Sequence, residues 1–265
     1  MRHVDRRFTQ TKERYAADDL ATMQEARRYA AHVFRLFQPH IGSRVLEVGC
    51  GIGTMTQALL NVADCVLAIE PNLNCAAVAQ KMLDCDSRFA LRICHLEQCD
   101  REELASHRFD TVFCVNVLEH IDDDVGALRS FRDVVMPDGR VLIFVPAIPA
   151  VYGPLDAELG HHRRYTKRSL SKAFDDAGLE LITLRYTNPI GLLGWALNSY
   201  VMKSTKHSLA QVRLFESLVA PWALPLEHFV NPLIGLSLVG VARRTSPHMS
   251  TRMHGSTSRT PDAGQ

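Results

Sequence analysis

Three glycines at alternating positions follow an acidic residue in the segment VLEVGCGIGTMTQAL. Glu47 stands two residues before Gly49, and Gly51 and Gly53 come next. A glycine-rich turn lets a ligand approach the backbone closely, and the helix N-terminus that follows it favours a carboxylate or a phosphate. The acid before the turn suits a ligand that carries an amino group beside its carboxylate.

The spacing of the glycines separates this turn from dinucleotide-binding turns. A dinucleotide-binding fold requires the pattern G-x-G-x-x-G, whereas Thr54 occupies the third glycine position here. The sequence therefore disfavours an oxidoreductase that uses a nicotinamide cofactor.

A second group of reactive side chains lies in the segment VPAIPAVYGPLDAELGHHRRYTKRSL. His161 or His162 could take a proton from a hydroxyl near pH 7, and Arg163 with Arg164 could hold an anion. In the alternative interpretation these side chains form salt bridges with helix acids and only fasten the loop. The catalytic candidates of this segment are Tyr152, His161, His162 and Tyr165.

Strand-like and helix-like runs alternate along the chain and must position these groups. Alternation of this kind builds right-handed βαβ units, so we expect an α/β fold with a mainly parallel sheet covered on both faces. The expected strands are 43–49, 65–71, 89–97, part of 108–121, 139–147, 179–187 and 236–244. The expected helices are 54–63, 72–86, 123–135 and 166–178, while 101–107 is expected as a short helix or a loop and 148–167 as a loop.

The segment EVGCGIG resembles motif I of the class I S-adenosylmethionine-dependent methyltransferases. Three further segments resemble motifs of that family in the same order: AIEP with Glu70 and Pro71, FDTVFCVNVLEHI, and MPDGRVLIFVP, where Asp138 replaces a glycine. The resemblance covers roughly residues 40–185, and 236–244 fits the family's seventh strand. It implies a Rossmann-like, doubly wound, seven-stranded sheet.

The resemblance also implies how the cofactor S-adenosylmethionine is held. Glu47 and the glycine turn would bind its methionine end, and Glu70 would accept hydrogen bonds from the ribose hydroxyls. Leu96 and Leu73 would enclose the adenine, with an acid at its amino group. The implied cofactor residues are Glu47, Gly49, Cys50, Gly51, Gly53, Glu70, Pro71, Leu96, Glu97 (or Asp100), Asn116, Val117 and Leu118.

The loop at 148–167 resembles a pattern, YG-x-x-D-x-x-x-GH-x-RRY, of a bacterial subgroup of these methyltransferases. The subgroup has no general substrate that could be transferred to this chain. His120, in LEHI, could contact substrate or cap the following helix. The substrate-contact candidates are His120, Asp156, Arg163, Arg164 and Trp195.

The predicted domain organisation has three parts. Residues 1–40 form a helical cap, residues 41–244 form the methyltransferase domain, and residues 245–265 form a disordered tail. An insert at about 189–234 is apolar almost all round. This insert favours a lipophilic acceptor or peripheral contact with a membrane, and an extra core layer or a dimer interface explains it equally well.

The composition excludes several classes of protein. The 265 residues carry 30 Lys and Arg against 29 Asp and Glu, so the near-neutral chain lacks the charge of a general nucleic-acid binder. No NPPY-type segment and no cysteine after Cys114 is present, which argues against DNA methylation. The seven cysteines include no C-x-x-C pair, so we expect no metal site and reduced thiols in the cytoplasm.

The leading hypothesis is therefore a methyltransferase that uses S-adenosylmethionine and acts on a small or lipid-like acceptor. Because the sulfonium is already activated, alignment for in-line displacement can supply most of the acceleration without a strong base. The alternatives are an RNA or protein methyltransferase and a non-catalytic, cofactor-binding partner subunit. We expect a monomer or a homodimer.

Overall fold

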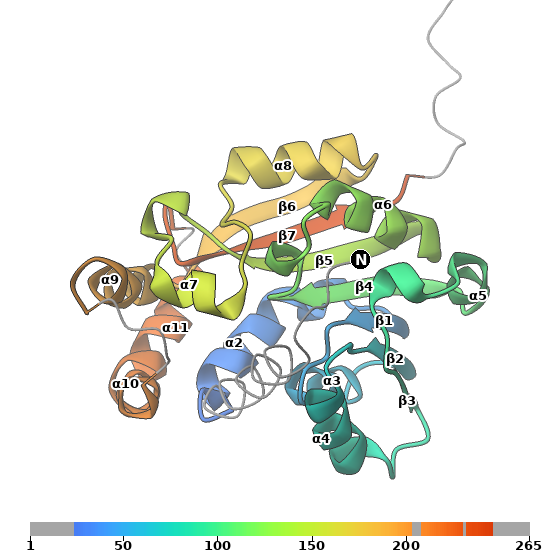
Figure 1. The fold of residues 1–265 in the computed structure, drawn as a ribbon, viewed down its shortest axis with the longest axis horizontal. Helices are drawn as coiled ribbons and strands as arrows, with labels where there is room; N and C mark the ends of the chain where they lie inside the picture. Colours follow the sequence, from blue (N-terminus) through green and yellow to red (C-terminus); the bar gives the residue numbers. More distant parts are fainter. Residues whose placement is uncertain (1–23, 203–207, 230–231, 246–265) are drawn as a thin grey trace, which may run out of the picture.

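The computed structural model describes residues 24–202, 208–229 and 232–245. At its centre is a seven-stranded sheet with the order β3-β2-β1-β4-β5-β7-β6 (Figure 1). The strands are β1 (Arg44–Val48), β2 (Cys65–Ile69), β3 (Phe89–Arg92), β4 (Phe109–Val115), β5 (Val135–Pro146), β6 (Glu180–Thr187) and β7 (Ser237–Arg243).

The pairings are parallel from β3 to β5, and β7 runs antiparallel to both β5 and β6. The strand order reverses between β1 and β4, which are direct neighbours. In open α/β sheets the ligand crevice forms at this reversal, outside the carboxyl ends of the strands. The predicted α/β fold with a doubly wound, mainly parallel, seven-stranded sheet is confirmed.

Helices cover both faces of the sheet because alternate strand residues point to opposite sides. One apolar layer joins Leu46 and Val112 to α5, α6 and α8, and the other joins Val45 and Phe113 to α2 and α3. The helices are α2 (Arg27–Phe37), α3 (Thr54–Leu59), α4 (Leu73–Leu83), α5 (Arg101–Ser106), α6 (Asp124–Val134), α7 (Pro154–Leu159), α8 (Lys167–Asp176), α9 (Pro189–Leu197), α10 (Leu209–Leu214) and α11 (Ala220–Phe229).

Short turns complete the described structure. The 3₁₀ turns are η1 (Gln38–His40), η2 (Leu96–Gln98), η3 (Leu118–His120) and η4 (Pro149–Val151), and the π turns are η5 (Asn198–Met202) and η6 (Phe215–Val219).

The segment 148–167, expected as a loop, contains the helix α7, so that expectation is wrong in part. Pro154 opens this helix, the Asp156 carboxylate accepts a hydrogen bond from the Gly153 backbone, and Gly160 ends it in the left-handed conformation. These are the usual helix start and stop residues. The helix has only six residues, so it is too short to show a helical period in the sequence.

The insert packs against α2 through the buried carboxylates of Glu216 and Glu227. Glu216 in η6 accepts hydrogen bonds from the backbone of Arg28 and Tyr29, at 2.8 and 2.9 Å, and so satisfies the N-terminus of α2. Other apolar side chains of the insert stay in solvent, including Leu193 at 72% exposure and Leu218 at 63%. The insert is therefore an added layer with an apolar outer surface.

Parts of the predicted domain organisation lie outside the described residues, namely 1–23 of the cap and 246–265 of the tail. None of the helices in the described ranges is long and apolar enough to span a membrane.

Replacing Glu227 with Ala should destabilise the fold by roughly 2–4 kcal/mol. The buried Glu227 carboxylate accepts hydrogen bonds from Thr187 and the Asn188 backbone and lies 3.5 Å from His32, and all three would lose this partner. Urea unfolding at pH 7 measures the loss, with the exposed Glu158→Ala as the control.

The difference in the free energy of unfolding between wild type and Glu227→Ala should depend on pH. Burial alone would raise the pKa of Glu227, but hydrogen bonds from His32, Thr187 and Asn188 outweigh it and lower the pKa. A lowered carboxyl pKa contributes stability above the unfolded value of about 4.3, and the contribution is lost as the pH falls below it. An unchanged gap between wild type and variant at pH 3 would contradict this assignment.

Candidate functional site

The glycine turn joins the end of β1 to the start of α3. Gly49, Gly51 and Gly53 all have positive φ, at 77°, 54° and 88°. The Gly49 and Cys50 backbones donate hydrogen bonds to the Ile69 carbonyl at 2.8 and 3.3 Å, which fastens the turn to the end of β2. A Cβ atom added to Gly49 would lie 2.2 Å from Cγ2 of Val117, so only glycine fits there.

Glu47, the fourth residue of β1, has a buried carboxyl group beneath this turn. Its exposure is 2%, and Oε2 has no hydrogen-bond partner among the described residues. Burial raises the pKa of Glu47 to about 7. Since buried polar atoms in native proteins are nearly always paired, this oxygen fits a ligand that brings a cationic donor.

Glu70 faces the same turn from the end of β2. Its Oε2 accepts a hydrogen bond from the Gly51 backbone at 2.8 Å, and its Oε1 accepts one from the Asn72 backbone at 2.9 Å. Burial raises the pKa of Glu70. A carboxylate has about four acceptor positions, so each oxygen can still accept a hydroxyl, as the predicted ribose contact requires. Pro71 follows and is exposed.

The predicted adenine-binding residues follow the neighbouring ends of β2 and β3, because the last residues of these two strands, Ile69 and Arg92, pair with each other. Leu96 is buried in η2, whereas Leu73 at the start of α4 is 63% exposed. Asp100 is occupied in capping α5, where it accepts two backbone hydrogen bonds. Of the two acids considered for the adenine amino group, the exposed Glu97 is therefore the available one.

The end of β4 turns sharply beside the glycine turn. Asn116 has a φ of 53°, and its backbone donates a hydrogen bond to the Phe144 carbonyl at 2.8 Å. Val117 is half-buried and Leu118 is fully buried. Because the Val117 side chain packs on Gly49, the structure brings these predicted cleft residues to the glycine turn.

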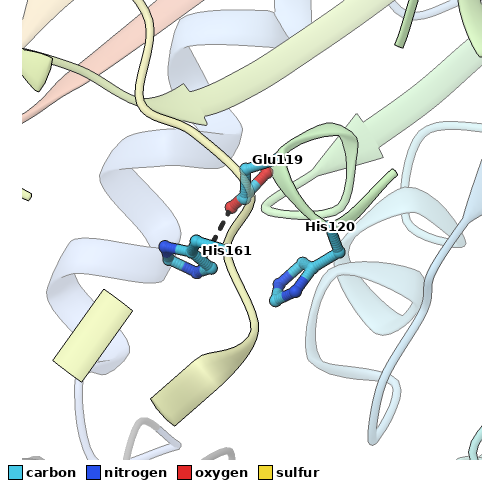
Figure 2. Close-up of side chains that lie close together, drawn as sticks. All are labelled: Glu119, His120 and His161. Atoms are coloured by element: carbon cyan, nitrogen blue, oxygen red, sulfur yellow. Dashed lines mark ion pairs between the residues drawn. The ribbon is translucent and has the colours of Figure 1, made fainter. Parts of the chain in front are cut away.

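Glu119 and His120, in η3, meet His161 from the α7–α8 connection (Figure 2). Glu119 is fully buried, and both of its carboxylate oxygens lack hydrogen-bond partners in the described chain. Burial raises the pKa of Glu119 to about 8. Its Oε1 lies 3.9 Å from Nε2 of His161, and the His120 and His161 ring centres are 4.8 Å apart.

Asp156 orients His161. Its Oδ1 lies 2.8 Å from Nδ1 of His161 and also accepts a hydrogen bond from Nε of Arg164 at 2.8 Å. The Arg164 guanidinium is buried and lies 4.5 Å from the centre of the Trp195 ring. Asp156 therefore has a full set of partners, unlike Glu119.

The remaining loop candidates are held by protein contacts. Arg163 lies 3.0 Å from Asp124, and the buried Tyr165 hydroxyl donates to the same carboxylate at 2.8 Å. The Tyr152 hydroxyl donates to the His161 carbonyl at 2.7 Å. These contacts are the kind expected if the segment is fastened by its charges.

His162 is exposed, and its backbone donates a hydrogen bond to the Glu119 carbonyl at 2.8 Å. This bond ties the loop to η3 and so helps to bring His161 to Glu119.

Sequence reasoning missed Glu119. The only signal is a carboxylate between apolar residues, Leu118 before it and Ile121 two positions after it. A charged residue in an apolar segment at the end of a strand is the sequence signal that predicts a buried carboxylate with a functional role.

The chain matches the protein family described as Methyltransferase domain over residues 9–184. The ubiquinone biosynthesis O-methyltransferase of Azorhizobium caulinodans is 30% identical over 118 residues, which are 44% of this chain and 45% of that relative. The chain spans less than half the length of the curated relatives that it matches first.

Solved structures share the fold. The N-methyltransferase NodS of Bradyrhizobium japonicum, in complex with S-adenosyl-L-homocysteine, has a TM-score of 0.60 and 15% identity, covering 89% of this chain and 98% of NodS. A putative methyltransferase in complex with the Haloferax volcanii Trm112 activator has a TM-score of 0.60 and 14% identity, covering 88% of this chain and 96% of that one. At these identities the likeness concerns the fold alone.

Replacing Gly49 with Ala should cost more stability than replacing Gly160 with Ala. Both glycines have a positive φ, 77° and 81°, so both substitutions introduce about 1–2 kcal/mol of backbone strain. Only at Gly49 does the new methyl group also meet Val117, whereas nothing lies within 4 Å at Gly160. Overpacking adds about 1–3 kcal/mol. Urea unfolding of both variants gives the difference, and equal losses would show that Val117 does not pack on the turn.

Proposed function

The chain belongs to the methyltransferase-domain family, and we propose that it transfers a methyl group from S-adenosylmethionine to a hydroxyl of a small or lipid-like molecule. The observation that carries the proposal is the unpaired, buried carboxylate oxygen of Glu47 beneath a turn of three positive-φ glycines. A cofactor with an ammonium group and a carboxylate at one end supplies what this oxygen and the α3 N-terminus lack.

In this proposal Glu47 accepts a hydrogen bond from the cofactor's ammonium group, and Glu70 accepts bonds from its ribose hydroxyls. The glycine backbone lies against the methionine end, because no side chain intervenes. Asn116 and Val117 line the cleft below the reactive sulfur. The cofactor supplies an activated methyl group, and these residues hold it in one orientation.

The acceptor end of the cleft is built from Glu119, His120 and His161. Glu119 and His120 come shortly after Val117, which packs on the glycine turn just after β4, so we expect the cluster to lie beyond the sulfur end of the predicted cofactor position. Polar atoms at this place suit an acceptor with a hydroxyl. The names of the curated relatives, which are O-methyltransferases of ubiquinone biosynthesis, support the same acceptor chemistry.

The apolar insert supports a lipid-like acceptor. It exposes Leu193, Trp222 and Leu226 at 72%, 56% and 58%, while Trp195 lies on the Arg164 guanidinium beside the acceptor cluster. A lipophilic molecule could therefore contact the insert while its hydroxyl reaches the cleft. Contact with a membrane surface, and a monomeric or dimeric state, stay predictions.

Glu47→Gln should weaken the binding of S-adenosylmethionine roughly 10- to 100-fold, since hydrogen bonds to charged groups contribute about 1.5–3 kcal/mol. Calorimetry at pH 7.5 measures the dissociation constant, with the exposed Glu158→Gln as the matched control.

Because the pKa of Glu47 is raised to about 7, the affinity of the wild type for S-adenosylmethionine should fall as the pH drops from 7 to 5.5. Only the ionised carboxylate attracts an ammonium group. The variant should show no such slope, and equal slopes would assign the effect to another residue.

The acceptor class is tested with cofactor that carries a heavy methyl group. The protein is incubated with this cofactor and a metabolite extract, an RNA fraction or a protein fraction, and labelled products are sought by mass spectrometry. Label in one low-molecular-weight product whose fragment ions place the heavy methyl group on oxygen supports the proposal, whereas label on nitrogen or carbon contradicts the hydroxyl acceptor. Label only in RNA or protein, or cofactor binding without any labelled product, contradicts it.

A further inference from the structure

Glu119, His120 and His161 form the one group of potential metal ligands found within the described residues (Figure 2). Their candidate ligand atoms all lie within 4.8 Å of one another. We propose that these three residues bind a divalent ion of the zinc type at the acceptor end of the cleft. Binding of the ion does not depend on the proposed function, and only the role of the ion in methyl transfer rests on that function.

The buried carboxylate is the first reason. Glu119 is fully buried, and neither of its oxygens has a hydrogen-bond partner in the part of the chain that the structure describes. An ionised carboxylate in such a place is costly unless it is paired or bound to a metal. The positive charge of Arg164 favours the ionised form of Glu119, but its guanidinium is hydrogen-bonded to Asp156 at 2.8 Å.

The orientation of His161 is the second reason. Its Nδ1 lies 2.8 Å from Oδ1 of Asp156, and its Nε2 lies 3.9 Å from Oε1 of Glu119. With the proton on Nδ1 and donated to Asp156, Nε2 presents a lone pair toward the carboxylate. In metal sites, the ring N–H of a ligand histidine that faces away from the metal commonly donates a hydrogen bond to a carboxylate.

The Asp156 carboxylate that orients His161 is itself held in a fixed position. Asp156 is fully buried and also accepts hydrogen bonds from Arg164 and from the Gly153 backbone. The His162 backbone is bonded to the Glu119 carbonyl at 2.8 Å, so the two segments that carry the ligands are joined. The imidazole is therefore held in place before any ion arrives.

In the Nδ1–H tautomer of His161, Nε2 and the ionised Glu119 carboxylate face each other as two acceptors, which need a cation or a proton between them. A shared proton requires a separation near 2.7 Å, which is shorter than the 3.9 Å between Glu119 and His161. An ion accommodates this gap and also explains the third side chain, because the His120 ring lies 4.8 Å from the His161 ring. Ligand atoms on one zinc ion are about 3.3 Å apart, so no pair of these atoms, all within 4.8 Å of one another, would need to close by more than roughly 1.5 Å.

Two imidazole nitrogens and one carboxylate oxygen are typical ligands of Zn²⁺ and similar ions, not of Mg²⁺ or Ca²⁺. Three protein ligands leave a position open on a tetrahedral ion, and His120 is the exposed member of the cluster. An acceptor hydroxyl bound there would lose its proton to water more readily. Its oxygen would then form the new bond to the methyl carbon, while the electrons of the broken carbon–sulfur bond return to sulfur.

The test uses the full chain, treated with a chelator and then titrated with ZnCl₂ or CoCl₂. We expect one ion per chain by calorimetry and visible absorption bands from the cobalt form, with no displacement by a thousandfold excess of MgCl₂. Glu119→Gln and His161→Ala should each weaken Zn²⁺ binding at least 100-fold. His40→Ala, which removes a histidine of η1 remote in sequence from all three ligands, should leave binding unchanged.

Folding and function are separated from binding in the same experiment. Glu119→Gln replaces a buried carboxyl group whose oxygens have no hydrogen-bond partner among the described residues, so its metal-free unfolding midpoint should equal or exceed that of wild type. Absence of saturable Zn²⁺ binding by wild type, or equal weakening by His40→Ala, overturns the proposal. If chelated protein transfers methyl groups at the full rate, the ion has no role in the reaction while the proposed function stands. If Zn²⁺ binds but no cofactor does, the proposed function falls and the metal site stands.

Discussion

The site depends on two carboxylates that the fold buries at the carboxyl edge of the sheet without completing their hydrogen bonds. Glu47 lies near the end of β1 and Glu119 just after β4, and these strands are direct neighbours. Removing a carboxylate from water costs several kcal/mol even after the protein relaxes. Burial accordingly raises the pKa of Glu47 to about 7 and that of Glu119 to about 8. The described chain leaves Oε2 of Glu47 and both oxygens of Glu119 without a hydrogen bond, so a bound cation or cationic donor would stabilise both carboxylates, which makes this edge suited to binding.

The surrounding structure shows the contrast with carboxylates whose role is structural. Asp156 is equally buried but receives bonds from Arg164, His161 and the Gly153 backbone. Glu227 likewise meets Thr187, and such acids fasten the loop and the insert to the core. These paired acids support the fold, whereas the two carboxylates with unsatisfied oxygens, Glu47 and Glu119, lie at the carboxyl edge of the neighbouring strands β1 and β4. Functional sites commonly depart from local rules in this way.

Much of the fold could be predicted from the sequence, because alternating strand and helix periods and a G-x-G-x-G turn are local signals. Every expected strand is present, and the glycine turn has the positive φ values that its residues permit. The cluster at Glu119 could not be predicted in the same way, since His161 is far along the chain and reaches η3 only through the fold. The helix α7 escaped because six residues show no period. The exposed apolar face of the insert also differs from the burial that its composition suggests.

The proposed cofactor site rests most directly on the buried Glu47 carboxyl group with its unsatisfied Oε2, and carbon-13 NMR of that carboxyl group measures the raised pKa that follows. The account predicts a pKa near 7 in the ligand-free protein, falling by at least two pH units when S-adenosylhomocysteine is added, because its ammonium group stabilises the ionised carboxylate. A ligand-free pKa near the ordinary glutamate value, or a pKa that does not change on addition of the ligand, would contradict the account.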